Sequence, residues 1–124
     1  MYIQTTRFIK VMVTPAYLRE QSEPIDNKYV WAYTIQLENM GHETVQLINR
    51  YWHITDATGS VQEVHGEGVI GEQPVLQPGD VYQYTSGAAL NTPSGIMRGH
   101  YEMTTMDGES FNITIPAFSL DSPE

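Results

Sequence analysis

Residues 97–115 read MRGHYEMTTMDGESFNITI, and this stretch decides the fold of the chain. Its first half leads into the dipeptide Asp107-Gly108, which suits a type I′ turn between two antiparallel strands. A period of two residues is typical of a strand with one buried face, so the stretch predicts a β-hairpin. The apolar residues that alternate with polar ones beyond the turn are Phe111, Ile113 and Ile115.

The same alternation extends outward over most of the chain, and helical periodicity is nearly absent. Inside 45–54 the apolar phase slips, which predicts a β-bulge near Ile48 and Asn49. The segment 17–24 is expected to be a connection with one helical turn, 39–42 a hairpin turn, 56–59 a second turn and 86–95 a loop of small residues. The further strands that this pattern predicts are 9–13 (ended by Pro15), 29–38, 45–54, 61–65 and 81–85.

This series of strands predicts a single all-β domain over residues 1–124. About seven antiparallel strands suit a β-sandwich of the fibronectin type III or immunoglobulin type, because an open sheet would leave an apolar face wet. The segment Leu76-Gln77-Pro78-Gly79-Asp80-Val81-Tyr82 resembles the tyrosine corner of such domains. We therefore expect the Tyr82 hydroxyl to bond to upstream backbone, with Tyr84 or an ordinary aromatic strand residue as the alternatives.

Composition excludes several classes of function. The chain contains no cysteine, so disulfides, thiolate metal sites and cysteine nucleophiles are ruled out. Its 15 acidic residues outnumber 6 scattered basic ones, for a net charge of −9, which argues against nucleic-acid and anionic-membrane partners. Neither a signal-like segment nor an apolar run of the ~18 residues that a membrane span needs is present, so a cytoplasmic location is expected.

Gly66, Gly68 and Gly71 form a G-x-G-x-x-G motif, the pattern found where backbone approaches a pyrophosphate. The dinucleotide version needs a helix after the loop, and Pro74, Pro78 and Gly79 leave no room for one. Two interpretations stay open: a nest of amides that binds an anion such as pyrophosphate, or glycines that serve a β-loop with positive φ and close packing. Adjacent acidic residues favour the structural interpretation, and no NAD or other cofactor is expected.

The sequence supports neither a metal site nor catalysis. The pairs His65-x-Glu67 and His100-x-Glu102 each point to one face of a strand and could meet across strands as a divalent-metal site. The alternative is that they are solvent-facing polar residues, which we favour because no ligand spacing is recognisable among the candidates. Catalysis by a serine nucleophile is not supported either, because Ser86, Ser94 and Ser110 lack a nucleophile-elbow context. The chain is therefore expected not to be an enzyme. The remaining candidate metal ligands are His42, His53 and Glu63.

Four segments in order resemble the ApaG family of small bacterial proteins: 45–56, 64–74, 76–87 and 95–103. The resemblance implies a fibronectin type III-like sandwich, in agreement with the strand pattern. It also implies an association with cobalt tolerance and magnesium efflux, without an established chemistry. Similar domains occur in an F-box protein and in a polymerase-delta-interacting protein, where binding of another protein is the natural role.

We therefore expect a small cytoplasmic, non-enzymatic binding or scaffolding module with a protein partner. A homodimer is also open, because aromatic strands such as 29–38 leave apolar residues on both faces. The alternatives are a regulator that binds divalent metal directly and a nucleotide or pyrophosphate binder that uses the glycine-rich loop.

Overall fold

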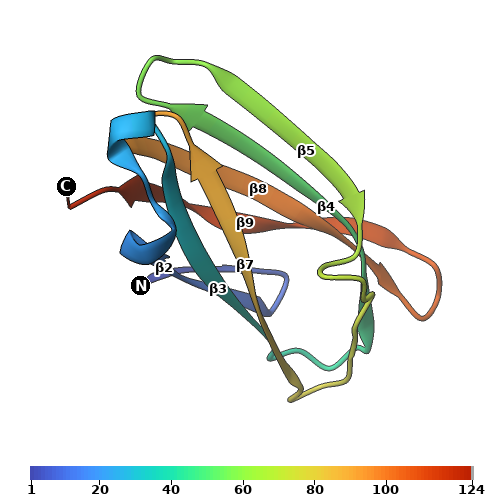
Figure 1. Cartoon of the computed structure of the whole chain (residues 1–124). Helices are drawn as coiled ribbons and strands as arrows, with labels where there is room; N and C mark the ends of the chain where they lie inside the picture. The colour runs from blue at the N-terminus through green and yellow to red at the C-terminus, as the bar shows by residue number, and fades with distance from the viewer. Residues whose placement is uncertain (124) are drawn as a thin grey trace.

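Two antiparallel sheets face each other in the computed structural model, which describes residues 1–123 (Figure 1). The four-stranded sheet has the order β1-β2-β3-β7, and the five-stranded sheet has the order β5-β4-β8-β9 with the short β6 paired to β4. The four-stranded sheet consists of β1 (Tyr2–Thr6), β2 (Ile9–Tyr17), β3 (Tyr29–Asn39) and β7 (Val81–Leu90). The five-stranded sheet consists of β4 (Val45–Asp56), β5 (Val61–Glu67), β6 (Val75–Leu76), β8 (Ser94–Thr105) and β9 (Ser110–Asp121).

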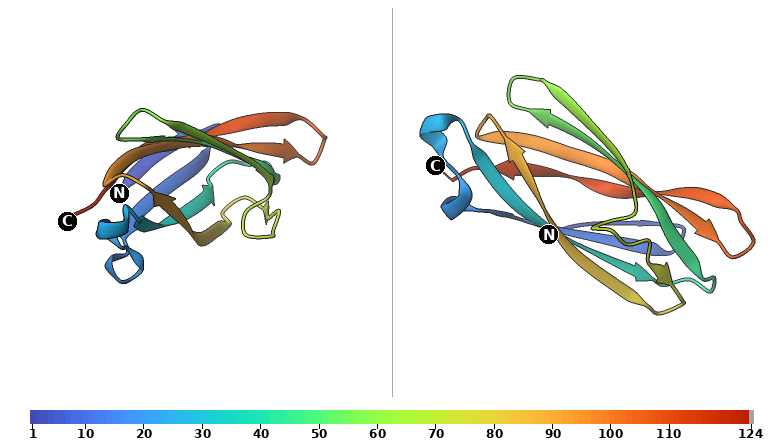
Figure 2. Two further views of the ribbon diagram at one scale, coloured as in Figure 1. Left: turned by 45° about the horizontal axis from the view of Figure 1, so that its top comes forward. Right: turned by 45° about the vertical axis from the view of Figure 1, so that its right-hand side comes forward.

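The predicted all-β sandwich is confirmed, with nine strands in residues 1–123 where about seven were expected. The turned views in Figure 2 show the two layers, and both termini lie at the same end of the sandwich in Figure 1. The connection between β2 and β3 holds two 3₁₀ turns, Arg19–Gln21 and Pro24–Asp26, where one helical turn was predicted. No helix in the described part of the chain is long and apolar enough to cross a membrane.

Strand β3 supplies the centre of the core. Buried and half-buried residues alternate along it, as the alternation of the sequence predicted, so one face of the strand points into the sandwich. The Tyr33 ring lies 5.3 Å from Trp52 and 5.9 Å from Phe118, which belong to the opposite sheet. Aromatic pairs at such separations add favourable edge-to-face contacts to the gain from burying their surface. The inward, buried residues of β3 are Tyr29, Trp31, Tyr33, Ile35 and Leu37.

Two β-bulges keep the apolar side chains of the five-stranded sheet inward. The bulge predicted at Ile48 is confirmed, since the register between β4 and β8 shifts between Leu47 and Asn49. A second shift, which the apolar pattern did not predict, lies between β8 and β9: Met97 pairs with Phe118 but Gly99 with Ile115. The extra residue lets both Ile115 and Phe118 be buried, although their spacing is odd.

The C-terminal hairpin is present, but the type I′ turn predicted for it is wrong. Only Gly108 has a positive φ (86°), and the Thr105 amide donates to the Glu109 carbonyl oxygen across a loop one residue longer. A three-residue loop that ends in a glycine of left-handed backbone conformation matches the twist of two strands as well as a type I′ turn does. The sequence Asp107-Gly108 therefore suits either kind of hairpin loop.

The predicted hairpin at 39–42 is also wrong, because this segment crosses from β3 in one sheet to β4 in the other. The side chain of Asn39 is buried there and donates to the carbonyl oxygens of Glu43 (2.7 Å) and Leu76 (3.0 Å). These bonds satisfy backbone groups at the crossover, which have no neighbouring β-strand to bond to.

Strands β2 and β7 run at least four residues further than the alternation predicted. Strand β2 continues through Pro15 to Tyr17, because β1 pairs only as far as Val13 and β2 is an edge strand beyond it. Most of the small residues of 86–95 also belong to strands, since β7 runs to Leu90 and pairs with β3 along its whole length. Gly87 and Ala89 lie on the exposed face of β7, which needs no packing, whereas Ala88 packs against the core.

Gly99 gives a test of this packing. A Cβ at Gly99 would lie 2.0 Å from the carbonyl oxygen of Tyr51, whereas one at Gly87 would lie 3.5 Å from its nearest neighbour, the Trp31 carbonyl oxygen. We expect Gly99→Ala to lower the free energy of unfolding by about 2–3 kcal/mol through overpacking, and the control Gly87→Ala to change it by less than about 1 kcal/mol. Urea denaturation measures both, and equal midpoints for the two variants would contradict the close approach of β8 to β4.

Candidate functional site

The glycine-rich segment forms a closed loop between β5 and β6. Ile70 and Gly71 both have positive φ (43° and 80°), and Val69 and Glu72 exchange both backbone hydrogen bonds around them. This is the geometry of a type I′ turn. The Gly68 amide donates to the Ile48 carbonyl oxygen at 2.8 Å, so three amides of the loop already have backbone partners and do not point together at a common anion.

The first glycine of the motif, Gly66, lies against the side chain of Arg50. Its guanidinium donates to the carbonyl oxygens of Glu67 (3.0 Å) and Gly68 (2.9 Å). A Cβ on Gly66 would lie 2.7 Å from the guanidinium carbon, so a larger residue there would displace the guanidinium from this position. The sequence carries no sign of this contact, because Arg50 and Gly66 meet only through the pairing of β4 with β5.

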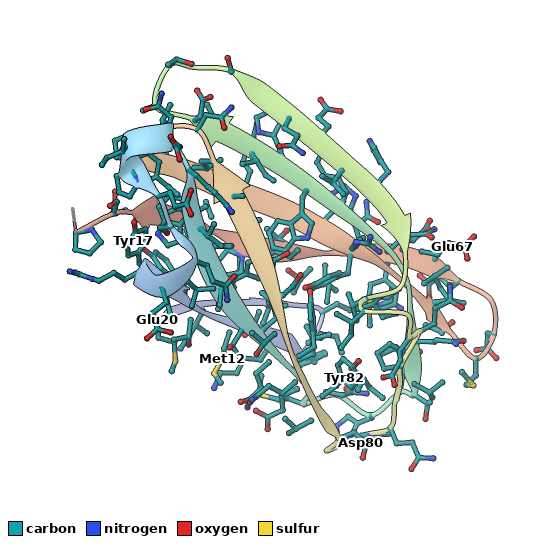
Figure 3. All side chains as sticks on the ribbon, in the orientation of Figure 1. Met12, Tyr17, Glu20, Glu67, Asp80 and Tyr82 are labelled. Atoms are coloured by element: carbon teal, nitrogen blue, oxygen red, sulfur yellow. The ribbon has the colours of Figure 1, made fainter. Side chains whose placement is uncertain are left out.

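Tyr82 does not form the tyrosine corner that was predicted. Its hydroxyl donates to a carboxylate oxygen of Glu72 at 2.8 Å, not to upstream backbone, and so ties the start of β7 to the glycine loop. Burial, the hydrogen bond and the negative charge of Glu72 together raise the pKa of Tyr82 to about 12. Figure 3 labels Tyr82 and Asp80 at this end of β7 and Glu67 at the end of β5.

Tyr84, the alternative corner residue, belongs instead to a buried group of tyrosines. Its hydroxyl shares a hydrogen bond with that of Tyr101 in the core between the sheets. Burial raises the pKa of both hydroxyls and also that of Tyr33, because an ionised phenol would lose its hydration there. These groups therefore remain neutral and serve the core.

Two of the histidines meet a tyrosine on the outer face of the five-stranded sheet. The Tyr51 ring lies 4.8 Å from His65 on β5 and 5.0 Å from His100 on β8, so three rings stand in a row across three strands. They border a hollow of about 470 Å³. Its lining includes Asn49, Tyr51, His65, Glu67, His100 and Glu102. We call this surface the Tyr51 face.

The two His-x-Glu pairs share this face, but they do not meet as the less favoured metal-site interpretation required. Strand β4 separates β5 from β8, and strands two apart in a sheet are about 10 Å from each other. Glu102 instead accepts a hydrogen bond from Asn49 at 2.5 Å, and His65 lies 3.8 Å from Glu63. Within residues 1–123, no three histidine, aspartate or glutamate side chains are grouped so as to hold a metal ion.

Of the other candidate metal ligands, Glu63 lies beside His65 of the row and only His42 lies far from it. His53 lies on β4 beyond Tyr51 and opposite Glu63, and His42 lies in the crossover between β3 and β4. The Tyr51 face therefore offers aromatic rings, amides and carboxylates at a surface, which are groups that make contacts with another molecule.

Comparison with known proteins identifies the family. A model of the ApaG domain matches residues 19–105. The chain belongs to the ApaG family. Protein ApaG from Agrobacterium fabrum is 61% identical over 123 residues, which are 99% of this chain and 95% of that protein. Protein ApaG from Paramagnetospirillum magneticum is 64% identical with the same coverage.

A solved structure of a similar protein has the same fold. The ApaA protein from Bordetella pertussis is 46% identical, with 94% of each chain covered, and superposes with a TM-score of 0.90. The segment matched by the ApaG domain model contains the glycine loop and all the residues named above for the Tyr51 face, and it leaves out β1, β2 and β9. The candidate site thus lies inside the part of the chain that defines the family.

The glycine loop yields a prediction with a matched control. A Cβ at Gly68 (φ 62°) would lie 2.2 Å from the Glu72 carbonyl oxygen, whereas one at Gly71 (φ 80°) has no atom within 4 Å. We expect Gly71→Ala to cost about 1 kcal/mol of stability for the left-handed conformation alone, and Gly68→Ala about 2–4 kcal/mol because the clash is added. Equal losses in urea denaturation would show that the loop does not close on Glu72.

Tyr82 yields a prediction about pH. Its pKa is about 12 in the folded chain against an ordinary value of 10.0, so the folded state keeps a proton that the unfolded state loses between these values. The stabilisation is complete below pH 10 and is lost as the pH rises toward 12. We expect Tyr82→Phe to flatten the fall in stability across this window, and Glu72→Gln to flatten it partly. A slope identical to that of the parent chain would contradict the hydrogen bond.

Proposed function

We propose that this ApaG-family chain is a small cytoplasmic binding module without catalytic activity, and that it acts by holding a protein partner. The observation that carries the proposal is the Tyr51 face, where a half-buried tyrosine stands between two histidines beside a hollow. Aromatic side chains in partly desolvated surroundings contribute a large share of the energy at protein interfaces. The hydrogen-bonding groups around Tyr51 would add specificity.

The family's association with cobalt resistance and magnesium efflux would then arise through the partner. Direct binding of a divalent metal has less support, because β4 separates the two His-x-Glu pairs. Pyrophosphate binding by Gly66, Gly68 and Gly71 also has less support, because the amides of Gly68, Val69 and Glu72 are paired with backbone carbonyl oxygens. Calorimetric titration with cobalt would separate direct metal binding from the proposed protein binding, since a protein-binding module needs no metal.

The test is capture of partners from a lysate of the source cells by the immobilised chain. We expect Tyr51→Ala to reduce the recovery of a specific partner at least tenfold, as loss of an interface aromatic worth about 2 kcal/mol would do. The control is Thr14→Ala, an exposed position on β2 in the other sheet. If both variants capture the same proteins as the parent chain, the Tyr51 face is not the binding surface. Saturable cobalt binding that His65→Ala abolishes would favour the metal alternative.

A further inference from the structure

Strand β7 has a neighbour on one side only. It ends the four-stranded sheet and, within residues 1–123, pairs with β3 alone. The Asn39 amide donates to the Asp80 carbonyl oxygen. Because successive residues of a strand direct their backbone groups to opposite sides, every second residue counted from Asp80 bonds to β3. The backbone groups that point away from β3, to the bare edge, therefore belong to Val81, Gln83, Thr85, Gly87 and Ala89.

The sheet edges differ in how they are protected. The edge strands β1 and β9 lie against each other: the Tyr2 hydroxyl bonds to Ser119, and the Thr6 hydroxyl accepts the amide of Thr114. Strand β5 carries Glu63, His65 and Glu67, and charges on an edge discourage another strand from pairing. Strand β7 reads VYQYTSGAAL, with no charged residue and no proline over ten positions. It is the edge with the least protection against a further strand.

Space for such a strand exists beside β7. The five-stranded sheet extends past β7 on this side, since β5 pairs with β4 and the four-stranded sheet ends at β7 (Figures 1 and 2). A hollow of about 140 Å³ lies between the two sheets there. It is bordered by Leu90 at the end of β7 and by Ile54 and Val61 from the opposite sheet, and Val61 is 53% exposed.

We propose that the edge of β7 accepts an extended segment of a partner protein as a fifth strand of its sheet. The outward backbone groups of β7 bond to the segment, and its alternate side chains enter the hollow at Leu90 and Ile54. Small apolar side chains fit this space. Basic residues flank the segment, because Asp56 borders the hollow, Asp80 precedes β7 and the chain carries a net charge of −9.

This inference rests on the proposed function, in which the chain binds a protein, but it uses a surface distinct from the Tyr51 face. Tyr51 lies on the outer face of the five-stranded sheet, and β7 belongs to the other sheet. The two proposals can therefore fail separately.

The probe is the peptide acetyl-Lys-Val-Thr-Val-Thr-Val-Lys-amide, titrated into the full chain and followed by amide hydrogen exchange. We expect saturable binding that slows the exchange of the outward amides of Gln83, Thr85 and Gly87. With the valines directed into the hollow, antiparallel pairing turns the threonine amides toward β7. The same peptide with N-methyl groups on its threonines cannot donate from those positions and should bind about tenfold or more weakly. This comparison needs no change in the protein.

Gln83→Pro removes one outward amide without taking a bond from the β3 ladder, and we expect it to weaken peptide binding about tenfold. Its matched control is Glu63→Pro, which removes an outward amide from the edge of β5 and should leave peptide binding unchanged, as should Tyr51→Ala. Unslowed exchange along β7, or equal binding by Gln83→Pro and the parent chain, would overturn the proposal. A two-chain mass in sedimentation that Gln83→Pro abolishes would make the occupant a second copy and also overturn it.

Discussion

The buried amide of Asn39 holds together the end of the sandwich at which the chain passes from one sheet to the other. Its side chain donates to the carbonyl oxygens of Glu43 and Leu76 and accepts the amide of Gly41, while its backbone amide donates to Asp80. One residue thus joins the crossover, β6 and the entry to β7. An apolar residue in its place would leave three backbone groups at the crossover without this partner, of which the Leu76 carbonyl oxygen is buried, at a cost larger than the bonds themselves contribute.

The glycine loop is built on this frame and serves packing. It closes as a type I′ turn, leaves room at Gly66 for the guanidinium of Arg50, and is tied to β7 by the bond between Tyr82 and Glu72. Three amides of the loop, those of Gly68, Val69 and Glu72, donate to carbonyl oxygens of the same loop and of Ile48. A motif known from nucleotide sites thus fixes the end of β5 and, with it, the position of the neighbouring Tyr51 face.

The unequal width of the two sheets separates two surfaces of different chemistry. The five-stranded sheet displays rings, amides and carboxylates on its outer face, where recognition would depend on side chains. The four-stranded sheet ends at β7 with unpaired backbone groups, where recognition would depend on the main chain and on the alternation of the incoming segment. The two proposed binding surfaces therefore lie on different sheets and do not overlap.

The sequence by itself indicated most of the strands, the bulge at Ile48 and the sandwich, because period-two alternation over most of the chain requires each strand to bury one face against a second layer. It also placed His65, Gly66, His100 and Glu102 among the candidate residues. Only the tertiary structure decided which strands are neighbours. That order put β4 between the two His-x-Glu pairs, set Arg50 over Gly66 and left β7 at an edge. Side-chain periodicity is a local property, whereas strand order and the partner of a hydroxyl such as that of Tyr82 depend on how both sheets pack together.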